Sequence, residues 1–255
     1  MLLAVDVGNT QTVLGLWEGD DLASVWRIAT RPMRTADDLA VLLDGLFTLR
    51  GLERRAITAL ALSSTVPVLE PEWSRLALDH LGVEALVVGP GVRTGIPVRV
   101  DNPREVGPDR VANALAAFTR YGGPCVVVDF GTSTNFDAVS AAGEYIGGVL
   151  APGIAISMEA LSARAARLLT VDLVAPPTVI GRNTVASLQS GAVYGFAGQV
   201  DGIVERMRGE LGEGAPAIAT GGLAELILPH SRTLEHYAPE LTLEGLRLLW
   251  ERNRA

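Results

Sequence analysis

Hydrophobic and polar residues follow one another along this chain in short blocks, and the spacing within each block predicts a secondary structure. Short apolar runs between turn residues indicate strands at residues 2–7, 12–17, 22–28, 57–62, 85–88, 125–129, 135–139, 145–149 and 217–220. Apolar residues at helical spacing indicate helices at residues 35–49, 70–81, 109–121, 154–168, 183–210, 223–228 and 242–252. The first three strands are joined by tight turns, which suggests an antiparallel meander. The mixture of strands and helices predicts an α/β fold.

The order of the predicted elements restarts near the middle of the chain. The segment VDVGNTQTVLGLWEGD, which contains Asp6, is similar to the segment VDFGTSTNFDAVSAAGE, which contains Asp129. In both, an aspartate ends an apolar run and is followed by a glycine and by hydroxyl or amide side chains. Internal similarity of this kind indicates a duplication. We therefore expect two halves, at residues 1–115 and 116–255.

Composition narrows the range of functions. The chain has 255 residues, of which 48% are hydrophobic, and this is enough to bury a sizeable core. The net charge of −8 disfavours nucleic-acid binding, which relies on an excess of basic residues. All 21 basic residues are arginines, so a Schiff-base lysine, a P-loop lysine and a protein-kinase lysine are excluded. Phosphate would have to be bound by backbone amides, hydroxyls, arginine and metal ions.

Cysteine and histidine contribute little candidate chemistry. Cys125 is the single cysteine, which excludes a disulfide framework within one chain, and we expect it to be a buried core thiol. His80, His230 and His236 lack ligand-like spacing and are expected to be structural or on the surface.

Asp6 interrupts the N-terminal apolar run too early for a secretory signal, and no apolar run reaches the ~18 residues of a membrane span. We expect a cytoplasmic protein without a membrane or nucleic-acid partner.

Three short motifs stand where predicted strands end. In the first, at residues 6–12, a glycine allows close approach of a ligand, Asn and Thr can meet phosphate oxygens, and Asp6 can hold a hydrated Mg²⁺. The second, at residues 129–134, occupies the equivalent place in the second half. The third, at residues 219–222, has paired glycines that could admit a flat nucleobase or ribose. Each motif alone is also compatible with an ordinary turn, whereas two aspartate-led loops in register suggest phosphate loops that face one another across a cleft.

These motifs, together with three others, resemble the type III pantothenate kinase family over essentially the whole chain. The segments that carry the resemblance are DVGNT (6–10), NPREVGPDR (102–110), DFGTST (129–134), GGVLAPG (147–153), GRNTVASLQSG (181–191) and TGG (220–222). The resemblance implies the actin/Hsp70/sugar-kinase fold, with two duplicated ribonuclease-H-like half-domains. The active site would lie in the cleft between them, with the first phosphate loop in the N-terminal half and the second phosphate loop and adenosine loop in the C-terminal half. It further implies a phosphotransferase that uses ATP to convert pantothenate to 4'-phosphopantothenate, the first step of coenzyme A biosynthesis.

The resemblance also implies roles for individual residues. The expected ATP contacts are Asp6, Val7, Gly8, Asn9, Thr10, Gln11, Thr12, Val13, Thr132, Gly221 and Gly222. The expected pantothenate contacts are Gly107, Pro108, Asp109, Arg110 and Thr184, with Asp109 as the catalytic base. Asp129 would bind a monovalent cation, K⁺ or NH₄⁺, and Asp6 would hold Mg²⁺ through water. A homodimer is implied as well, in which Thr184 could reach the pantothenate site of the partner chain.

Physical reasoning about residues 107–110 agrees with the role that the resemblance implies. Pro108 suits the first turn of a helix, where its missing N–H is not needed. Arg110 could hold a substrate carboxylate with its forked guanidinium. Asp109 is expected to stay ionised near the positive end of the helix, and therefore to be a weak base that mainly orients the hydroxyl. The alternative is that Asp109 only interacts favourably with the helix dipole.

The sequence departs from the common family pattern at two places, and two alternative functions are also compatible with it. Val100 stands near the position where family members often carry an aromatic residue, and the second loop reads GTSTN instead of the common GTATT. A kinase for another small hydroxylated acid or sugar would differ only in the substrate pocket. A non-catalytic nucleotide-binding regulator is the other alternative, although Asp6, Asp109 and Asp129 are all retained.

The predicted helix at residues 183–210 bears on the expected homodimer. It carries small residues that could allow a second helix to approach closely. These residues are Ala186, Gly191, Ala192, Gly195, Ala197 and Gly198. Packing inside the same chain would explain them equally well.

Overall fold

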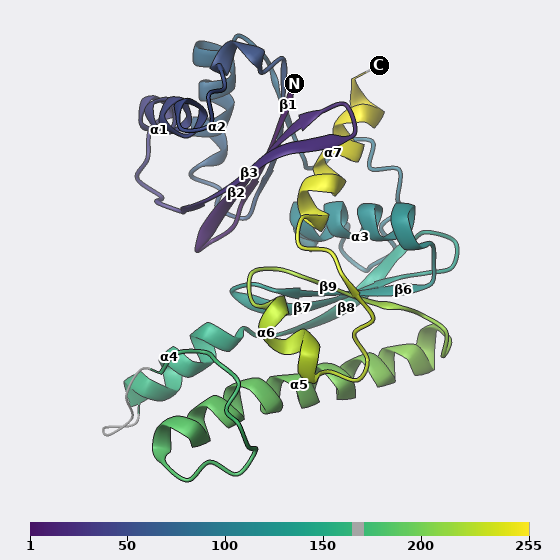
Figure 1. Cartoon of the computed structure of the whole chain (residues 1–255). Coiled ribbons are helices and arrows are strands. Elements are labelled where there is room, and N and C mark those ends of the chain that lie inside the picture. Colours follow the sequence, from purple (N-terminus) through teal and green to yellow (C-terminus); the bar gives the residue numbers. More distant parts are fainter. Residues whose placement is uncertain (165–170, 255) are drawn as a thin grey trace. The chain divides into compact units, whose positions relative to one another are not determined.

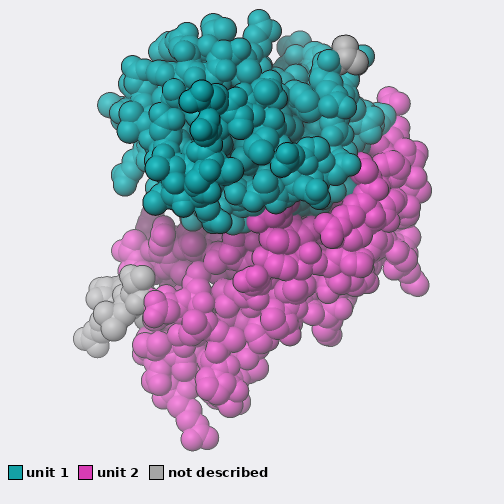
Figure 2. Space-filling view, turned by 45° about the horizontal axis from the view of Figure 1, so that its top comes forward, with its two compact units in different colours: residues 1–97, 101–116, 241–255 teal, residues 98–100, 117–240 magenta. Residues whose placement is uncertain are grey.

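In the computed structural model, which describes residues 1–164 and 171–254, the chain forms two compact units (Figure 2). Unit 1 comprises Met1–Pro97, Asp101–Ala116 and Leu241–Ala255. Unit 2 comprises Val98–Val100 and Ala117–Glu240. The expected division into residues 1–115 and 116–255 differs from these units, because the last segment returns to unit 1. The helix α3 (Pro108–Tyr121) continues from one unit into the other.

Unit 1 is built on a five-stranded mixed sheet (Figure 1). Its strands are β1 (Leu2–Val7), β2 (Gln11–Glu18), β3 (Asp21–Ala29), β4 (Ala59–Ser64) and β5 (Ala85–Val87), in the order β3-β2-β1-β4-β5. Strands β1, β2 and β3 form an antiparallel meander, as predicted, whereas β4 and β5 run parallel to β1. The meander arises because tight turns join three alternating runs.

Helices cover both faces of the unit 1 sheet. Leu3, Val5, Leu60 and Leu62 form a buried core with α1 (Ala36–Thr48) and α2 (Glu70–Leu76), which continues as one wider turn at Ala77–Leu81. The other face packs against α7 (Leu241–Asn253). Within unit 1, the Thr242 hydroxyl donates to the buried Asn113 Oδ1 (2.8 Å) and so joins α7 to α3. Short 3₁₀ turns lie at Arg54–Ala56 and Pro103–Glu105.

Unit 2 repeats the same sheet. Its strands are β6 (Cys125–Phe130), β7 (Ser133–Val139), β8 (Tyr145–Pro152), β9 (Ala217–Thr220) and β10 (His236–Tyr237), in the order β10-β9-β6-β7-β8. From the β8 edge, this order and the strand directions match those of unit 1 from the β3 edge. The predicted duplication is therefore confirmed at the level of topology. The sequence pattern did not predict β10, which has only two residues.

The helices of unit 2 are α4 (Ile154–Arg164), α5 (Thr184–Leu211) and α6 (Ala224–Ile227), with a 3₁₀ turn at Leu228–His230. Residues 165–168 of the helix predicted at residues 154–168 lie outside the described residues. The long helix α5 begins after Asn183, whose side chain accepts from the Ala186 amide (2.8 Å). Its apolar face packs on Val126, Val128 and Phe130 of β6.

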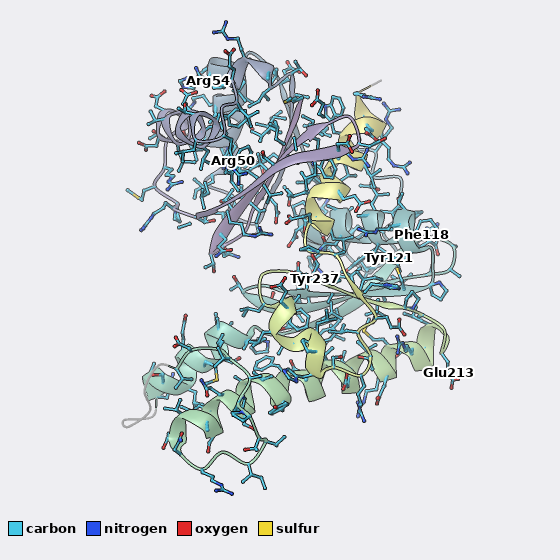
Figure 3. The ribbon with its side chains drawn as sticks, in the orientation of Figure 1. Arg50, Arg54, Phe118, Tyr121, Glu213 and Tyr237 are labelled. Carbon is cyan, nitrogen blue, oxygen red and sulfur yellow. The ribbon has the colours of Figure 1, made fainter. Side chains whose placement is uncertain are left out.

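The single cysteine and the histidines have the structural roles expected of them. Cys125 is buried, and burial raises the pKa of its thiol to about 12. His236 stacks on Tyr121 with ring centroids 4.6 Å apart, and Figure 3 labels Tyr121. His230 meets Tyr194 edge-on, and His80 Nε2 lies 2.8 Å from the Asp37 carboxylate. In the part of the chain that the structure describes, no helix combines the length and apolar character that a membrane crossing requires.

Candidate active site

The turn between β1 and β2 forms the first predicted phosphate loop. Asp6 is the penultimate residue of β1 and pairs with Val13 on one side and with Ser63 on the other. The Gly8 amide donates to the Gln11 carbonyl (3.0 Å), which closes the turn. Asn9, Thr10 and Gln11 are exposed at its tip. A loop of this kind offers amides and hydroxyls to an anion.

Threonines from neighbouring strands hold this loop in place. The Thr30 hydroxyl donates to the Gly8 carbonyl (2.7 Å), and the Thr30 amide donates to the Thr10 carbonyl (2.9 Å). Thr12 is buried, and its hydroxyl lies 2.9 Å from the Thr30 hydroxyl. The Thr65 amide and hydroxyl both donate to the Val7 carbonyl (2.9 and 3.1 Å). Because the side chains of Val7 and Thr12 are buried, the exposed surface of the loop comes from residues 9–11.

The turn between β6 and β7 is the second predicted phosphate loop. The Gly131 amide donates to the Ser133 carbonyl (2.9 Å), and Thr132 is exposed. The Gly153 amide donates to the Thr132 carbonyl (3.0 Å) at the start of α4. A β-carbon on Gly153 would lie 2.6 Å from the Gly131 carbonyl oxygen and closer still to that of Thr132. Gly153 is thus required for this approach, a role that sequence reasoning did not assign although the residue lies in the GGVLAPG motif.

The structure brings the predicted adenosine loop against the second phosphate loop. Asp129 of β6 pairs in register with Thr220 of β9, so that the residues after both strands are neighbours. Gly221 has a φ of +90°, and a β-carbon there would collide with the Asp129 carboxylate and lie 2.7 Å from the Phe130 carbonyl oxygen. Only glycine fits this position. Gly222 is exposed, with open space where its side chain would be.

The predicted substrate residues lie at the beginning of α3. Pro108 is the first helical residue, as predicted, and the Gly107 carbonyl accepts from the Arg110 and Val111 amides (3.1 and 3.3 Å). Asp109 Oδ1 folds back against Gly107 and occupies the space that a β-carbon there would take. This atom is buried and has no hydrogen-bond partner among the described residues. Within the described part of the chain, one oxygen of this carboxylate therefore remains without a donor.

The surroundings of Asp109 shift the pKa of its carboxyl. Burial raises the pKa of this carboxyl, while the amides of Arg110 and Asp109 and the Arg110 charge act in the opposite direction. The positive end of the helix was expected to keep Asp109 a weak base, but desolvation outweighs that effect. A carboxylate with a raised pKa is the stronger proton acceptor when it is ionised.

Thr184 is the first residue of α5 and is exposed, as a ligand contact requires. It belongs to unit 2, whereas residues 107–110 belong to unit 1. Val100 lies in the short segment Val98–Val100, which precedes α3 in the chain and belongs to unit 2. Its Cγ1 is 3.8 Å from the position that a β-carbon on Gly147 would take. In this place Val100 packs along β8.

Two aspartates stand at the predicted ion sites, Asp6 in β1 and Asp129 in β6. Asp6 supplies one carboxylate at a strand end, and Mg²⁺ needs few protein ligands because it retains water. At the other site, the Asp129 carboxylate and the backbone amide and carbonyl of Phe130 all lie against Gly221, where a β-carbon would collide with them. Carboxylate and carbonyl oxygens suit a hard cation. Among residues 1–164 and 171–254, no cluster of three or more His, Cys, Asp and Glu side chains is arranged to hold a metal ion.

Two copies of one mixed sheet, each with an aspartate near the end of its first strand beside a glycine turn, define the duplicated fold of the actin-like ATPases and sugar kinases. Solved structures share this fold. One is the activator of 2-hydroxyisocaproyl-CoA dehydratase from Clostridium difficile, with a TM-score of 0.54 at 11% identity over 99% of this chain and 94% of that chain. Another is a candidate 2-dehydro-3-deoxygalactonokinase from Sinorhizobium meliloti, with a TM-score of 0.62 at 13% identity over 98% and 95%.

Sequence similarity then identifies the family. The family model for type III pantothenate kinases matches residues 2–206, and the chain belongs to this family. A type III pantothenate kinase from Frankia alni is 55% identical over 99% of this chain and 100% of the relative. Relatives of the same name from Moorella thermoacetica and Acidothermus cellulolyticus are 51% and 56% identical, over 99% of this chain and 100% and 99% of the respective relative.

Proposed function

We propose that this protein transfers the γ-phosphoryl group of ATP to the primary hydroxyl of pantothenate and forms 4'-phosphopantothenate, the first step of coenzyme A biosynthesis. The observation that carries this proposal is the similarity to type III pantothenate kinases over the full length, at 51–56% identity. A cytoplasmic location, expected for such an enzyme, stays a prediction.

The site geometry supports a role for each predicted segment. The exposed tip of the first loop and Thr132 of the second would contact the ATP phosphates, and Gly221 and Gly222 would border the adenosine. Asp109 would accept the proton of the pantothenate hydroxyl, and Arg110 would hold the pantothenate carboxylate. Mg²⁺, held through water by Asp6, would neutralise phosphate charge when bound.

A coupled assay of ADP release tests the proposal most directly. With Mg²⁺ and K⁺ present, pantothenate should support turnover, whereas a panel of sugars and other hydroxy acids should not. Turnover with another member of the panel and none with pantothenate would favour the alternative of a different small-molecule kinase. ATP-analogue binding without turnover on any substrate would favour a non-catalytic regulator. Family membership disfavours both alternatives.

Asp129 would bind a monovalent cation, K⁺ or NH₄⁺, beside the second phosphate loop. Asp129 lies near the end of β6 next to this loop, and a carboxylate oxygen suits a hard cation, which supports this assignment. Turnover should fall sharply when K⁺ is replaced by Na⁺ or by a bulky organic cation at equal ionic strength. Equal rates in all three salts would exclude the cation role.

A homodimer assembled through unit 2 is supported by exposed apolar side chains around α4 and α5. Leu150 is 64% exposed and Ile180 is 83% exposed. Ile156, Leu161, Val179 and Val185 are further exposed members of this group. Exposure of so many large apolar residues commonly marks an interface.

The small residues of α5 divide between two faces of the helix. Ala192 and Ala197 are buried in the unit 2 core, whereas Gly191, Gly195 and Gly198 are exposed with open space beside them. Glycine weakens a helix, so an exposed row of it suits close approach of a second copy. Light scattering at assay concentration should give the dimer mass, and an active monomer would contradict the proposal.

A further inference from the structure

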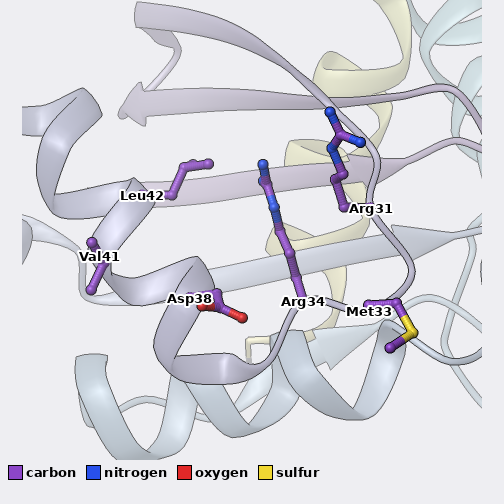
Figure 4. Close-up of a pocket in the computed structure, with 6 residues that line it drawn as sticks. All are labelled: Arg31, Met33, Arg34, Asp38, Val41 and Leu42. Atoms are coloured by element: carbon purple, nitrogen blue, oxygen red, sulfur yellow. The ribbon is translucent and has the colours of Figure 1, made fainter.

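The connection between β3 and α1 places two arginines at a pocket in unit 1. The pocket has a volume of about 540 Å³ and is lined by Arg31, Met33, Arg34, Asp38, Val41 and Leu42. The Arg34 amide donates to the Arg31 carbonyl (3.1 Å), and this turn sets the two residues close together. Figure 4 shows that both arginine side chains extend in the same direction and that Leu42 points toward the Arg34 guanidinium.

The arginines of this pocket are only partly matched by its acidic residue. The Asp38 carboxylate accepts from the amide and the hydroxyl of Thr35 (3.1 Å each), in the capping box of α1. The pocket is thus lined by two arginines and by one carboxylate that is already hydrogen-bonded within the capping box. Arg34 Nη1 is buried and has no hydrogen-bond partner in the described part of the chain, and a buried charged donor calls for an acceptor.

The pocket belongs to a segment that is tied directly to the first phosphate loop. Ala29, at the end of β3, pairs with Gln11 of the loop. The next residue, Thr30, bonds to Gly8 and Thr10 through its hydroxyl and its amide. Arg31 follows immediately, so its backbone is held beside that loop.

The predicted phosphate-binding segments lack positive charge of their own. Residues 6–13, 129–135 and 220–222 contain no basic residue, and the chain has no lysine. A polyphosphate is strongly negative, and arginine is the side chain best suited to bind its oxygens in pairs. Among the lining residues, the partly buried Leu42 lies on the side of the pocket toward which the Arg34 side chain extends.

We propose that Arg31 and Arg34 form a phosphate-binding pocket beside the first loop. Its ligand is a terminal phosphate group, which could belong to the nucleotide or to the phosphorylated product. This assignment rests on the proposed function for the identity of those two ligands, but not for the binding of phosphate itself.

Titration calorimetry on the full-length protein tests this pocket. The probes are inorganic tripolyphosphate, a non-hydrolysable ATP analogue and 4'-phosphopantothenate, each without the second substrate. Arg31→Gln and Arg34→Gln should each weaken tripolyphosphate binding about tenfold or more, and Arg31→Lys should restore part of it. Arg50→Gln is the matched control, because it removes the same charge just beyond the other end of α1 and should change nothing (Figure 3).

The three probes separate the two sources of phosphate. Loss confined to tripolyphosphate and the ATP analogue assigns the pocket to the nucleotide, whereas loss confined to 4'-phosphopantothenate assigns it to the product. Unchanged binding of all three probes in Arg31→Gln with a wild-type melting temperature would overturn the proposal, as would a wild-type protein that binds none of them. A wild-type protein that binds tripolyphosphate through these arginines but does not phosphorylate pantothenate would leave the pocket standing and refute the proposed function.

Discussion

Asp109 in unit 1 and Asp201 in unit 2 both have buried carboxylate oxygens, but these oxygens differ in their hydrogen bonding. Asp109 Oδ1 lies against Gly107 without a hydrogen-bond partner among the described residues. Asp201, in the middle of α5, is 4% exposed and holds the 231–233 loop. Its Oδ1 accepts from the Ser231 and Thr233 hydroxyls (2.7 and 3.0 Å) and from the Arg232 and Thr233 amides (2.9 and 3.2 Å).

The two surroundings shift the two pKa values in opposite directions. Burial raises the pKa of Asp109. Burial acts in the same direction on Asp201, but the hydrogen bonds from Ser231, Arg232 and Thr233 outweigh it and lower its pKa. A carboxylate whose hydrogen bonds are satisfied is a structural anchor, whereas one that is buried and incompletely bonded is available for chemistry.

Of the substitutions considered, Asp109→Asn should have the largest effect, and it should lower the rate of turnover without lowering the stability. Loss of a general base lowers kcat by about 10²–10⁴-fold. Asparagine is nearly the same size and bears no charge to desolvate, so stability at neutral pH should be equal or higher. The kcat, the melting temperature and ATP-analogue affinity should be measured on one preparation. A nearly normal kcat would show that Asp109 is structural and would remove the contrast with Asp201.

Asp201→Ala should have the converse effect. Removing the acceptor leaves several donors near α5 without a partner, which should lower the free energy of unfolding by about 3 kcal/mol. The kcat per folded molecule at low temperature should stay within about twofold of wild type, because Asp201 belongs to no proposed binding segment. Denaturant unfolding and active-site titration measure the two quantities. A large loss of kcat in the folded fraction would contradict the purely structural role.

The pH dependence of stability should have opposite signs for the two aspartates. Asp109 binds its proton more tightly when folded, so its contribution is present below about pH 4 and is lost as the pH rises through the raised pKa. Asp201 binds its proton more weakly when folded, so its contribution is present above about pH 4 and is lost as the pH falls through the lowered pKa. The difference in unfolding free energy between wild type and each variant, measured from pH 3 to pH 8, isolates the contribution of each aspartate. Parallel difference curves would refute the contrast.

Arg232→Ala should have the smallest effect. The Arg232 side chain is 78% exposed and its Nε lies 3.2 Å from Asp201 Oδ2. Because the guanidinium group is in solvent, its pairing with the buried carboxylate should contribute about 1 kcal/mol or less, and the Arg232 backbone amide still donates to Asp201. The melting temperature should therefore fall by no more than a few degrees. A loss as large as that of Asp201→Ala would mean that charge pairing, rather than the loop hydrogen bonds, anchors Asp201.

Much of the fold could be predicted from local pattern. The period of the apolar residues predicted the β1–β3 meander and the helix that begins after Thr35, and the similarity of two short motifs predicted the repeat that relates Asp6 to Asp129. Each of these signals is carried by residues that are close together in the sequence. The two-residue strand β10 and the return of α7 to unit 1 carry no local signal. Both depend on pairing or packing between segments far apart in the chain.

For the candidate site as well, the residues could be identified from the sequence, whereas their contacts could not. Sequence alone determined the candidate residues, since the aspartates, glycines and Pro108 are visible as motifs, and the lack of lysine directs attention to arginine. Only the tertiary structure decided that Thr30 ties the first loop in place, that Gly153 and Gly221 must be glycine, and that burial raises the pKa of Asp109. The physical reason is that hydrogen bonding, close backbone approach and desolvation depend on which distant residues surround a group, and motifs do not record those neighbours.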